Sequence, residues 1–363
     1  MLTRMRFQNW RSLKDVTIDH LTPITVFIGA NSSGKTNILD ALYFVRDWFV
    51  YGVSETVFAW QGKTQIQTFG TTGPVEIEVS FKASVNELVR YLYTINFDQS
   101  TTVATGRRID HFAKTSNGKL VNQLENLSEF DFTNANLLNQ ITEKFFRERM
   151  QMLDENFSPP LAVPTSRKPD VYMMDRCAEN FITVFEFMKY ANLTVYEQIQ
   201  DDARFLLAHV NSIHAERAEH ESRLHIREKL HPDIDAPTIS AGTARVLAML
   251  AAYYVLDMRD AELPGLVVIE EPDTALNPGL LERFVEQLRN YTEGEHPRQF
   301  ILTTHNPYFL NYFKPEEVQV VERGEDGYTT VKPFDAKIAA RWLEKDFALG
   351  DIWTSRVVGG VPT

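Results

Sequence analysis

The stretch ITVFIGANSSGKT, residues 24–36, decides the fold. Residues 24–28 are β-branched or aromatic and precede a glycine, a pattern that predicts a buried strand. Residues 38–49 carry apolar side chains at roughly helical spacing, which predicts a helix. Gly29 to Thr36 lie between them and match G-x-x-x-x-G-K-[ST]. The stretch therefore has the strand–loop–helix context in which this pattern forms a phosphate-binding loop.

The loop residues explain why this pattern binds phosphate. Glycines allow consecutive backbone N–H groups to turn inward around an anion, and the N-terminus of the following helix adds a favourable dipole. Lys35 is expected to reach the β- and γ-phosphates, and the Thr36 hydroxyl to ligate Mg²⁺. An ordinary Gly/Ser turn is the alternative. The predicted nucleotide contacts are Gly29, Ala30, Asn31, Ser32, Ser33, Gly34, Lys35, Thr36 and Asn37.

Two carboxylates and a histidine follow later predicted strands. Glu270 and Glu271 end the run LVVIEE at 266–271, and ligands bind at the carboxyl ends of strands in open α/β sheets. One carboxylate can hold Mg²⁺, and the next can polarise an attacking water. His305 follows the run QFILTT at 299–304. It could contact the γ-phosphate, or it could simply cap a helix.

Ser240 and Gly242 open an apolar helix predicted at 243–258. A serine at this place can cap the helix, and the helix N-terminus makes a second anion site. Since residues 29–36 already supply one phosphate loop, this second site could face a nucleotide held by another copy of the chain. A plain helix cap is the alternative.

The order of the predicted elements indicates an α/β fold. Strands alternate with helices after Pro237, as in a mixed or parallel sheet with crossover helices. Residues 5–18 predict a hairpin, and 64–82 predict two strands around Gly73-Pro74. We expect an N-terminal head segment at 1–82, a mainly helical insert at 83–235 and a C-terminal head segment at 236–363.

Composition excludes several classes of protein. The 363 residues carry 37 basic and 49 acidic side chains, a net charge of −12, which disfavours a protein that simply coats nucleic acid. Cys177 is the single cysteine, so neither an internal disulfide nor a thiolate-rich zinc site can form. The longest apolar run, 246–256, is too short to span a bilayer. We expect a cytoplasmic protein that makes no contact with membrane.

Taken in order, the phosphate loop, the Ser-x-Gly segment, the paired-acid strand and the histidine resemble the ABC-class ATPase heads of the RecF, SMC and OLD groups. The similarity covers residues 1–50 and 237–312 and, less fully, ALGDIWTSRVVGG at 348–360. It is greatest to the stand-alone AAA-twenty-one and AAA-fifteen predicted ATPases of bacteria and archaea, many encoded in phage-defence loci.

The resemblance implies a role for each matching residue. Lys35 and Thr36 would be the Walker A pair, Glu270 the Mg²⁺ carboxylate, Glu271 the catalytic glutamate, Ser240 and Gly242 the signature, residues 274–277 the D-loop and His305 the switch histidine. The chain departs from the family at two positions, since the family often has a histidine at Asn277 and an acidic or polar residue at Ala241. Both positions lie at the expected dimer contact. The Q-loop glutamine could be Gln65, Gln67 or Gln99.

The resemblance also implies an activity and partners. Two copies, or a higher oligomer, would sandwich ATP and Mg²⁺, hydrolyse the ATP, and gate a nuclease or toxin subunit or bound DNA, in anti-phage defence or DNA repair. A transporter's nucleotide-binding subunit is one alternative, but its usual Ser-Gly-Gly-Gln signature reads Ser-Ala-Gly-Thr at 240–243. A nucleotide-gated scaffold with negligible turnover is the other.

Three further groups of residues predict surface features. His209, His214, His220, His225 and His231 are interpreted as a solvated helix face, because helical spacing keeps them too far apart to share a metal ion. Asp233-x-Asp235 is interpreted as a polar loop and not as a Toprim-type nuclease site. The basic pairs Arg107-Arg108 and Arg167-Lys168 are expected in surface loops, where they could touch DNA phosphates.

Overall fold

The computed structural model describes residues 1–84, 87–97, 103–114, 120–122, 144–155, 157–164, 172–235, 238–258, 264–293 and 297–361. The chain forms two compact units. Unit 1 comprises Met1–Arg147 and Phe313–Thr363, and unit 2 comprises Glu148–Tyr312. Unit 1 therefore unites both ends of the chain, a division that differs from the three consecutive segments expected from the sequence.

An antiparallel sheet forms one layer of unit 1. Its strands are β1 (Leu2–Trp10), β2 (Leu13–Ile18), β4 (Val75–Ser84), β5 (Glu87–Phe97), β6 (Val103–Lys114) and β7 (Leu120–Asn122), in the order β2-β1-β4-β5-β6-β7. Alternate residues of β1, such as Met5 and Phe7, are buried, as expected for a sheet with one covered face. The predicted hairpin at 5–18 is confirmed by the β1–β2 pair.

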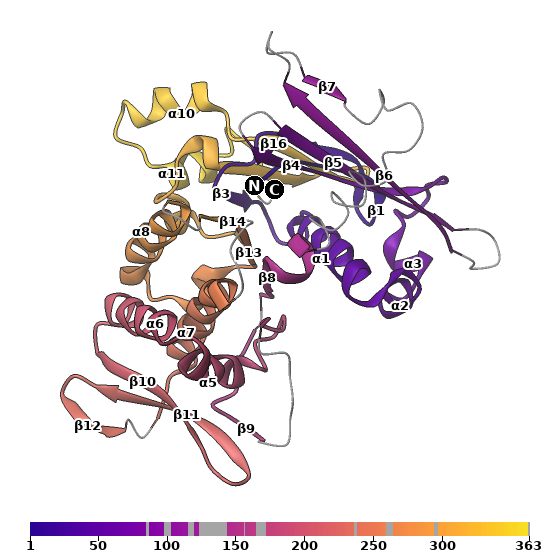
Figure 1. The fold of residues 1–363 in the computed structure, drawn as a ribbon. Coiled ribbons are helices and arrows are strands. Elements are labelled where there is room, and N and C mark those ends of the chain that lie inside the picture. Colours follow the sequence, from indigo (N-terminus) through magenta and orange to yellow (C-terminus); the bar gives the residue numbers. More distant parts are fainter. Residues whose placement is uncertain are drawn as a thin grey trace. The chain divides into compact units, whose positions relative to one another are not determined.

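The phosphate-loop segment forms a second layer of unit 1. Strand β3 (Ile24–Ile28) pairs in parallel with β15 (Val318–Arg323), which pairs antiparallel with β16 (Thr329–Pro333). Helix α1 (Lys35–Tyr51) follows the loop. Unit 1 also contains the helices α2 (Val53–Ala59), α3 (Lys63–Ile66), α10 (Ala336–Leu343) and α11 (Leu349–Thr354). The strand and the helix predicted around the loop are both confirmed (Figure 1).

One prediction for this region is wrong. The segment at 64–72 was expected to be a strand, but it contains the end of α3 and a loop that makes a single bridge from Gln67 to Trp10. Gly62 and Gly70 adopt positive φ angles, which turn the chain away from an extended path before β4 begins.

Three parallel strands form the centre of unit 2, in the order β14 (Arg298–Thr304), β13 (Gly265–Ile269), β8 (Met150–Leu153). Every residue of β13 and β14 is buried, which explains the continuous apolar run of β13 and the apolar centre of β14 at residues 300–302. The α-helices of this unit are α5 (Phe181–Ala191), α6 (Leu193–Leu206), α7 (Ala241–Tyr254), α8 (Leu281–Thr292) and α9 (Pro307–Leu310). The strands and long helices predicted after Pro237 are confirmed.

A small separate sheet completes unit 2. Strand β11 (Glu221–Glu228) pairs with β10 (Val210–Arg217), β12 (His231–Asp235) and β9 (Ala162–Pro164), all antiparallel (Figure 1). The mainly helical interpretation of 83–235 is wrong, since strand exceeds helix among the residues described there. The apolar residues of 83–235 show no regular helical spacing, because strands β10 and β11 bury only one face.

This sheet also corrects two interpretations of polar segments. The histidines from 209 to 231 do not line a helix, and Asp235 ends a strand instead of lying in a loop. Arg107 and Arg108 belong to β6 and not to a loop. Arg167-Lys168 and Gln99 lie outside the described residues.

Trp10 anchors the core of unit 1 beside the phosphate-loop helix. Its side chain is fully buried, and its ring lies 5.1 Å from that of Phe44 on α1 and 6.0 Å from that of Trp60. Its indole Nε1 donates a 2.8 Å hydrogen bond to the carbonyl oxygen of Asn37. Strand β1 thus holds the first turn of α1 by both packing and hydrogen bonding.

We predict that Trp10→Ala lowers the free energy of unfolding by about 3–5 kcal/mol, because it leaves a large cavity and removes the hydrogen bond to the Asn37 carbonyl oxygen. Tyr51→Ala is the matched control, since this aromatic ring at the end of α1 is 64% exposed and its loss should cost at most about 0.5 kcal/mol. Urea unfolding followed by tryptophan fluorescence and circular dichroism measures both. Equal midpoints for the two variants would contradict the anchoring role.

Candidate functional site

Lys35 is the first residue of α1 and lies inside the glycine loop. Its side chain is buried, and its Nζ donates hydrogen bonds to the carbonyl oxygens of Gly29 (2.9 Å) and Ala30 (3.1 Å). A buried ammonium group needs such partners, because an unpaired charge is costly to remove from water. The loop therefore wraps around its own lysine, and no acidic residue occupies the first turn of α1.

Glycine is required at both ends of the loop. A Cβ atom on Gly29 would lie 2.2 Å from the backbone carbonyl oxygen of Val321, and a Cβ on Gly34 would lie 2.1 Å from Thr329 Oγ1. Gly34 also has a φ of 110°, which residues with a side chain rarely adopt. The glycines of the motif thus permit both the loop conformation and its close contact with β15 and β16.

Distant segments of unit 1 brace the loop from two sides. Thr329 Oγ1 on β16 donates a 2.7 Å hydrogen bond to the Ser33 carbonyl oxygen. The Ala30 N–H donates to the carbonyl oxygen of Gly360 (2.8 Å), and the Gly360 N–H donates in turn to Glu322 Oε1 (2.8 Å). The loop conformation therefore depends on the C-terminal part of the chain.

The loop fits a phosphate chain. Its buried Ser33 hydroxyl has no hydrogen-bond partner among the described residues, and no side chain caps the N-terminus of α1. Asn31, Ser32 and Thr36 are exposed. A hydroxyl without a partner, a lysine and a helix N-terminus on one loop are features that bind a nucleotide's phosphates. A hydroxyl such as that of Thr36 is the donor type that would hold Mg²⁺.

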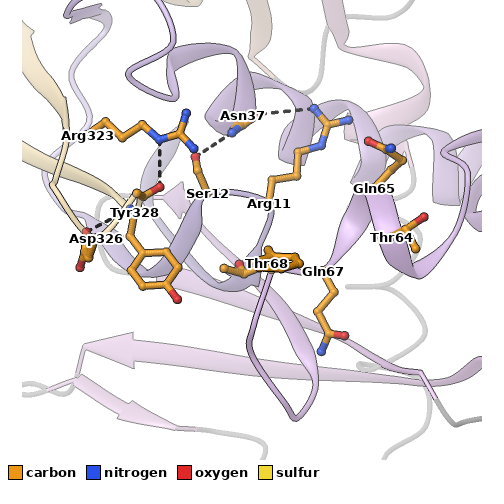
Figure 2. Close-up of a pocket in the computed structure, with 12 residues that line it drawn as sticks. Arg11, Ser12, Asn37, Thr64, Gln65, Gln67, Thr68, Arg323, Asp326 and Tyr328 are labelled. Atoms are coloured by element: carbon orange, nitrogen blue, oxygen red, sulfur yellow. Dashed lines mark hydrogen bonds between the residues drawn. The ribbon is translucent and has the colours of Figure 1, made fainter.

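A pocket opens beside the loop within unit 1 (Figure 2). Asn37 contributes to its wall, where its Nδ2 donates to Ser12 Oγ (2.7 Å) and its Oδ1 accepts from Arg11 (3.4 Å). Two of the three candidate Q-loop glutamines, Gln65 and Gln67, also line it. Phe69, which is 95% exposed, stands at this pocket as well.

The paired carboxylates occupy the end of β13 in unit 2. Glu270 and Glu271 are both largely buried, and the Glu270 N–H donates to the Leu153 carbonyl oxygen of β8 (2.9 Å). Glu271 has a φ of 47°, an uncommon left-handed conformation for a non-glycine residue. Its N–H donates to Thr303 Oγ1 on β14 (3.1 Å). The chain therefore turns sharply at Glu271, just after the strand ends.

His305 lies beside Glu271. Its Nδ1 is 2.8 Å from Glu271 Oε1, although His305 follows β14 and the glutamates follow β13. The ring is 44% exposed, whereas the glutamate side chain is 8% exposed. The helix-cap alternative is wrong for His305, since Asn306 caps α9 with its own side chain. Two residues that the sequence predicted separately are thus brought into contact.

The predicted D-loop follows Glu271 directly. Thr274 Oγ1 donates to the Glu271 carbonyl oxygen (2.8 Å) and accepts from Arg245 of α7 (3.3 Å). Burial raises the pKa of Asp273, although hydrogen bonds with Thr304 and Asn306 lower it in part. Asn277 caps the following 3₁₀ turn through Gly279 N–H (3.0 Å). These contacts link the acidic turn to the helix that Ser240 begins.

Ser240 is the N-cap of α7. Its Oγ accepts from the Thr243 N–H (3.0 Å) and donates to Thr243 Oγ1 (2.8 Å), which confirms the capping interpretation. Ser240 itself is exposed, and it lines a hollow with Ile239, Thr243 and His209. Gly242 follows within the first turn. The helix N-terminus is therefore accessible.

Comparison with known proteins agrees with this arrangement. The family model described as "AAA domain, putative AbiEii toxin, Type IV TA system" matches residues 24–311. The chain belongs to this family. Its fold and its motifs are those of an ABC-class P-loop ATPase of the RecF, SMC and OLD type, as the sequence predicted.

Individual relatives of this AAA_21 family member are distant. The OLD nuclease of Thermus scotoductus is 22% identical over 362 aligned positions, which cover 91% of this chain and 64% of the nuclease. The chain thus spans less than two thirds of that relative. The DNA replication and repair protein RecF of Lactococcus lactis is 26% identical over 91 positions, 23% of this chain and 25% of RecF. The SMC head domain from Thermotoga maritima has a similar fold, with a TM-score of 0.51 and 16% sequence identity. The match covers 92% of this chain and 99% of the SMC head domain.

Sequence reasoning missed the residues that brace the loop. Ser12, Thr329 and Gly360 were not predicted as site residues, although the VVGG stretch and the Arg-Ser turn before β3 were visible signals. Arg11 has a positive φ of 45° and places its guanidinium over the Trp60 ring.

No helix among the described residues is both long and apolar enough to cross a bilayer.

We predict that Gly360→Ala weakens nucleotide binding about tenfold, equivalent to about 1.4 kcal/mol. The added Cβ would lie 2.7 Å from Val320 Cγ1 and 3.1 Å from Trp353 Nε1, and so would shift the carbonyl that holds Ala30. Gly70→Ala is the matched control, because Gly70 has nearly the same φ (76° against 78°) and nothing lies within 4 Å of its added Cβ. Titration with a fluorescent ATP analogue compares the affinities of the two variants. Equal affinities would show that the contact between Gly360 and Ala30 does not support nucleotide binding.

Proposed function

We propose that this chain binds ATP with Mg²⁺ and hydrolyses it to ADP and phosphate. The observation that carries the proposal is the buried Lys35 ammonium inside a glycine loop whose buried Ser33 hydroxyl has no hydrogen-bond partner among the described residues. In this proposal Lys35 exchanges the carbonyl oxygens of Gly29 and Ala30 for the β- and γ-phosphates. Charge-assisted bonds of this kind are stronger than those to neutral carbonyls, so ATP is favoured over the closed loop.

Glu271 is proposed to accept the proton of the attacking water. Its carboxylate is buried, its backbone is held by Thr303, and His305 contacts one of its oxygens, so its position is restricted. His305 is proposed to orient that carboxylate and to contact the γ-phosphate. Mg²⁺, held by Thr36 and Glu270, would neutralise charge on the phosphates. Positioning and electrostatics supply most of the catalysis in such reactions.

Dimerisation is proposed to use the N-terminus of α7. Ser240 is exposed there, and Gly242 leaves the first turn open to a close approach. A second copy of the chain would present its nucleotide to this helix end, which favours an anion through its unpaired N–H groups and its dipole. ATP would thereby close the dimer, and hydrolysis would open it.

The output of this cycle is proposed to be the control of a partner in the cytoplasm. The family description names a toxin, and one relative is named as a nuclease. Both support a separate nuclease or toxin subunit, or bound DNA, as the element that the dimer gates. Anti-phage defence or DNA repair is the proposed setting.

We predict that Lys35→Ala weakens ATP binding roughly ten- to a hundredfold, because a charge-assisted hydrogen bond contributes about 1.5–3 kcal/mol. Isothermal titration with ATP and Mg²⁺ measures the change. Lys345→Ala is the control, since that lysine is exposed after α10 in the same unit and belongs to none of the contacts that hold the loop. Unchanged affinity in the Lys35 variant would refute the phosphate-loop assignment.

We predict that Glu271→Gln reduces turnover about 10²–10⁴-fold while ATP still binds, because an amide is a far weaker proton acceptor than a carboxylate. The ATP-bound dimer should then accumulate, since hydrolysis no longer opens it. Glu270→Gln is the matched comparison at the adjacent position and should instead weaken the Mg²⁺-dependent part of binding.

Phosphate release measures the turnover, and light scattering with and without ATP measures the mass of the dimer. Introducing Ser240→Arg into the Glu271→Gln protein should prevent the ATP-dependent increase in mass while leaving nucleotide binding intact. Near-normal turnover of Glu271→Gln with a mass independent of ATP would show that the two carboxylates are misassigned.

A further inference from the structure

Two histidines face each other across the small sheet of unit 2. His214 on β10 is directly opposite His225 on β11 in the strand register. Their rings are nearly parallel, with an interplanar angle of 14° and centroids 5.2 Å apart. The neighbouring residues Leu224 and Ile226 are buried, so strand alternation places the histidines on the sheet's other, more open face.

Asp235 brings a carboxylate to the same pair from β12. Its Oδ2 lies 3.1 Å from His225 Nδ1, and its Oδ1 lies 3.4 Å from His214 Nε2. One ligand atom from each of the three side chains lies within 4.8 Å of the others. Three strands that are separate in sequence therefore converge on a single point.

This spacing suits a small metal ion. Zinc binds imidazole nitrogen and carboxylate oxygen at roughly 2.0–2.2 Å, so neighbouring ligand atoms in a tetrahedral site lie roughly 3.3 Å apart. Each Asp235 oxygen lies at about this distance from one histidine nitrogen, 3.1 Å for His225 and 3.4 Å for His214, and one ligand atom per side chain lies within 4.8 Å of the others. The side chains of His214, His225 and Asp235 are 24%, 21% and 32% exposed, so an ion could reach them from solvent.

Two neighbouring side chains, Glu216 and Arg227, also favour metal binding by these three residues. His225 Nε2, the ring nitrogen that points away from Asp235, lies 3.7 Å from Glu216 Oε2. Metal-binding histidines usually direct their second nitrogen to such a carboxylate, which fixes the ring. Arg227 Nε donates to Asp235 Oδ1 (3.1 Å) and so orients the carboxylate.

We propose that His214, His225 and Asp235 form a binding site for a divalent transition-metal ion of the zinc class, independent of the ATP site. Imidazole ligands select zinc, cobalt, nickel or copper over magnesium and calcium, which prefer oxygen. Three protein ligands leave one position of a tetrahedral ion for water.

The ion would tie β12 to the β10–β11 hairpin. Asp235 is the last residue of β12, and Ser240 begins α7 five residues later. The hollow beside Ser240 is lined by residues of the same hairpin, including Ile226 and Glu228. Metal binding would therefore restrict the segment that leads into the α7 N-terminus.

The test is metal titration of the full-length protein without nucleotide. Zn²⁺ affinity is measured by competition with a chromophoric chelator, and Co²⁺ binding by its visible absorption, which is strong for tetrahedral sites. The wild-type protein should bind one ion at this site. His225→Ala and Asp235→Asn should weaken Zn²⁺ binding more than tenfold and remove the tetrahedral Co²⁺ absorption, whereas Glu216→Gln should weaken it about tenfold.

His220→Ala is the matched control, because His220 lies in the turn of the same hairpin and is exposed. This variant should retain wild-type affinity. Circular dichroism without metal checks the fold, and Asp235→Asn keeps the side-chain shape if a histidine variant is unstable. Hydrogen exchange over residues 231–240 should slow when Zn²⁺ is added to the wild-type protein. Equal Zn²⁺ affinity for His220→Ala, His225→Ala and Asp235→Asn, or displacement of Zn²⁺ by equimolar Mg²⁺, would overturn the proposal.

Discussion

The Lys35 ammonium held by carbonyl oxygens of its own loop is the interaction on which unit 1 depends. A buried charge requires close partners, and these partners are backbone atoms, so the loop must keep a single conformation. That requirement explains why Gly29 lies against the Val321 backbone and why Thr329 and Gly360 bond to the loop. Strands β15 and β16 and the C-terminal segment serve chiefly to hold a conformation that residues 29–36 could not keep alone.

In unit 2, neighbouring residues likewise hold the chain in one conformation at the two glutamates. Adjacent residues on an extended strand point to opposite faces, but Glu271 leaves the strand with a positive φ and turns toward His305. That strained conformation is sustained by Thr303 on the neighbouring strand and by the Thr274 hydroxyl. Backbone strain of this kind persists only where the surroundings over-determine it, and it is common at functional sites. The D-loop contacts of Arg245 then connect the acidic turn to α7.

The two helix N-termini that are predicted to face anions differ in their local chemistry. Helix α1 begins with an uncapped glycine and a lysine, whereas α7 begins with a serine that satisfies one of its own N–H groups. In the proposed cycle, the first end would hold phosphates bound by the same chain. The second end is capped and exposed, which suits the proposed contact with a nucleotide held by another copy. The proposed metal site would act on the segment that leads to this second end.

The sequence by itself determined the phosphate loop, the strands and helices on either side of it, the acidic pair and His305, because these features depend on short spacings and on continuous apolar strands that end in polar residues. Other features were decided only by tertiary structure. Ala30 meets Gly360, and His214 meets His225 and Asp235, through strand register and long-range hydrogen bonds. Helical spacing predicted that these histidines lie apart, because a one-face-buried hairpin and an irregular helix have similar patterns of apolar residues. Pairing between strands is a property of the folded chain, and no local periodicity records which residues will lie opposite one another.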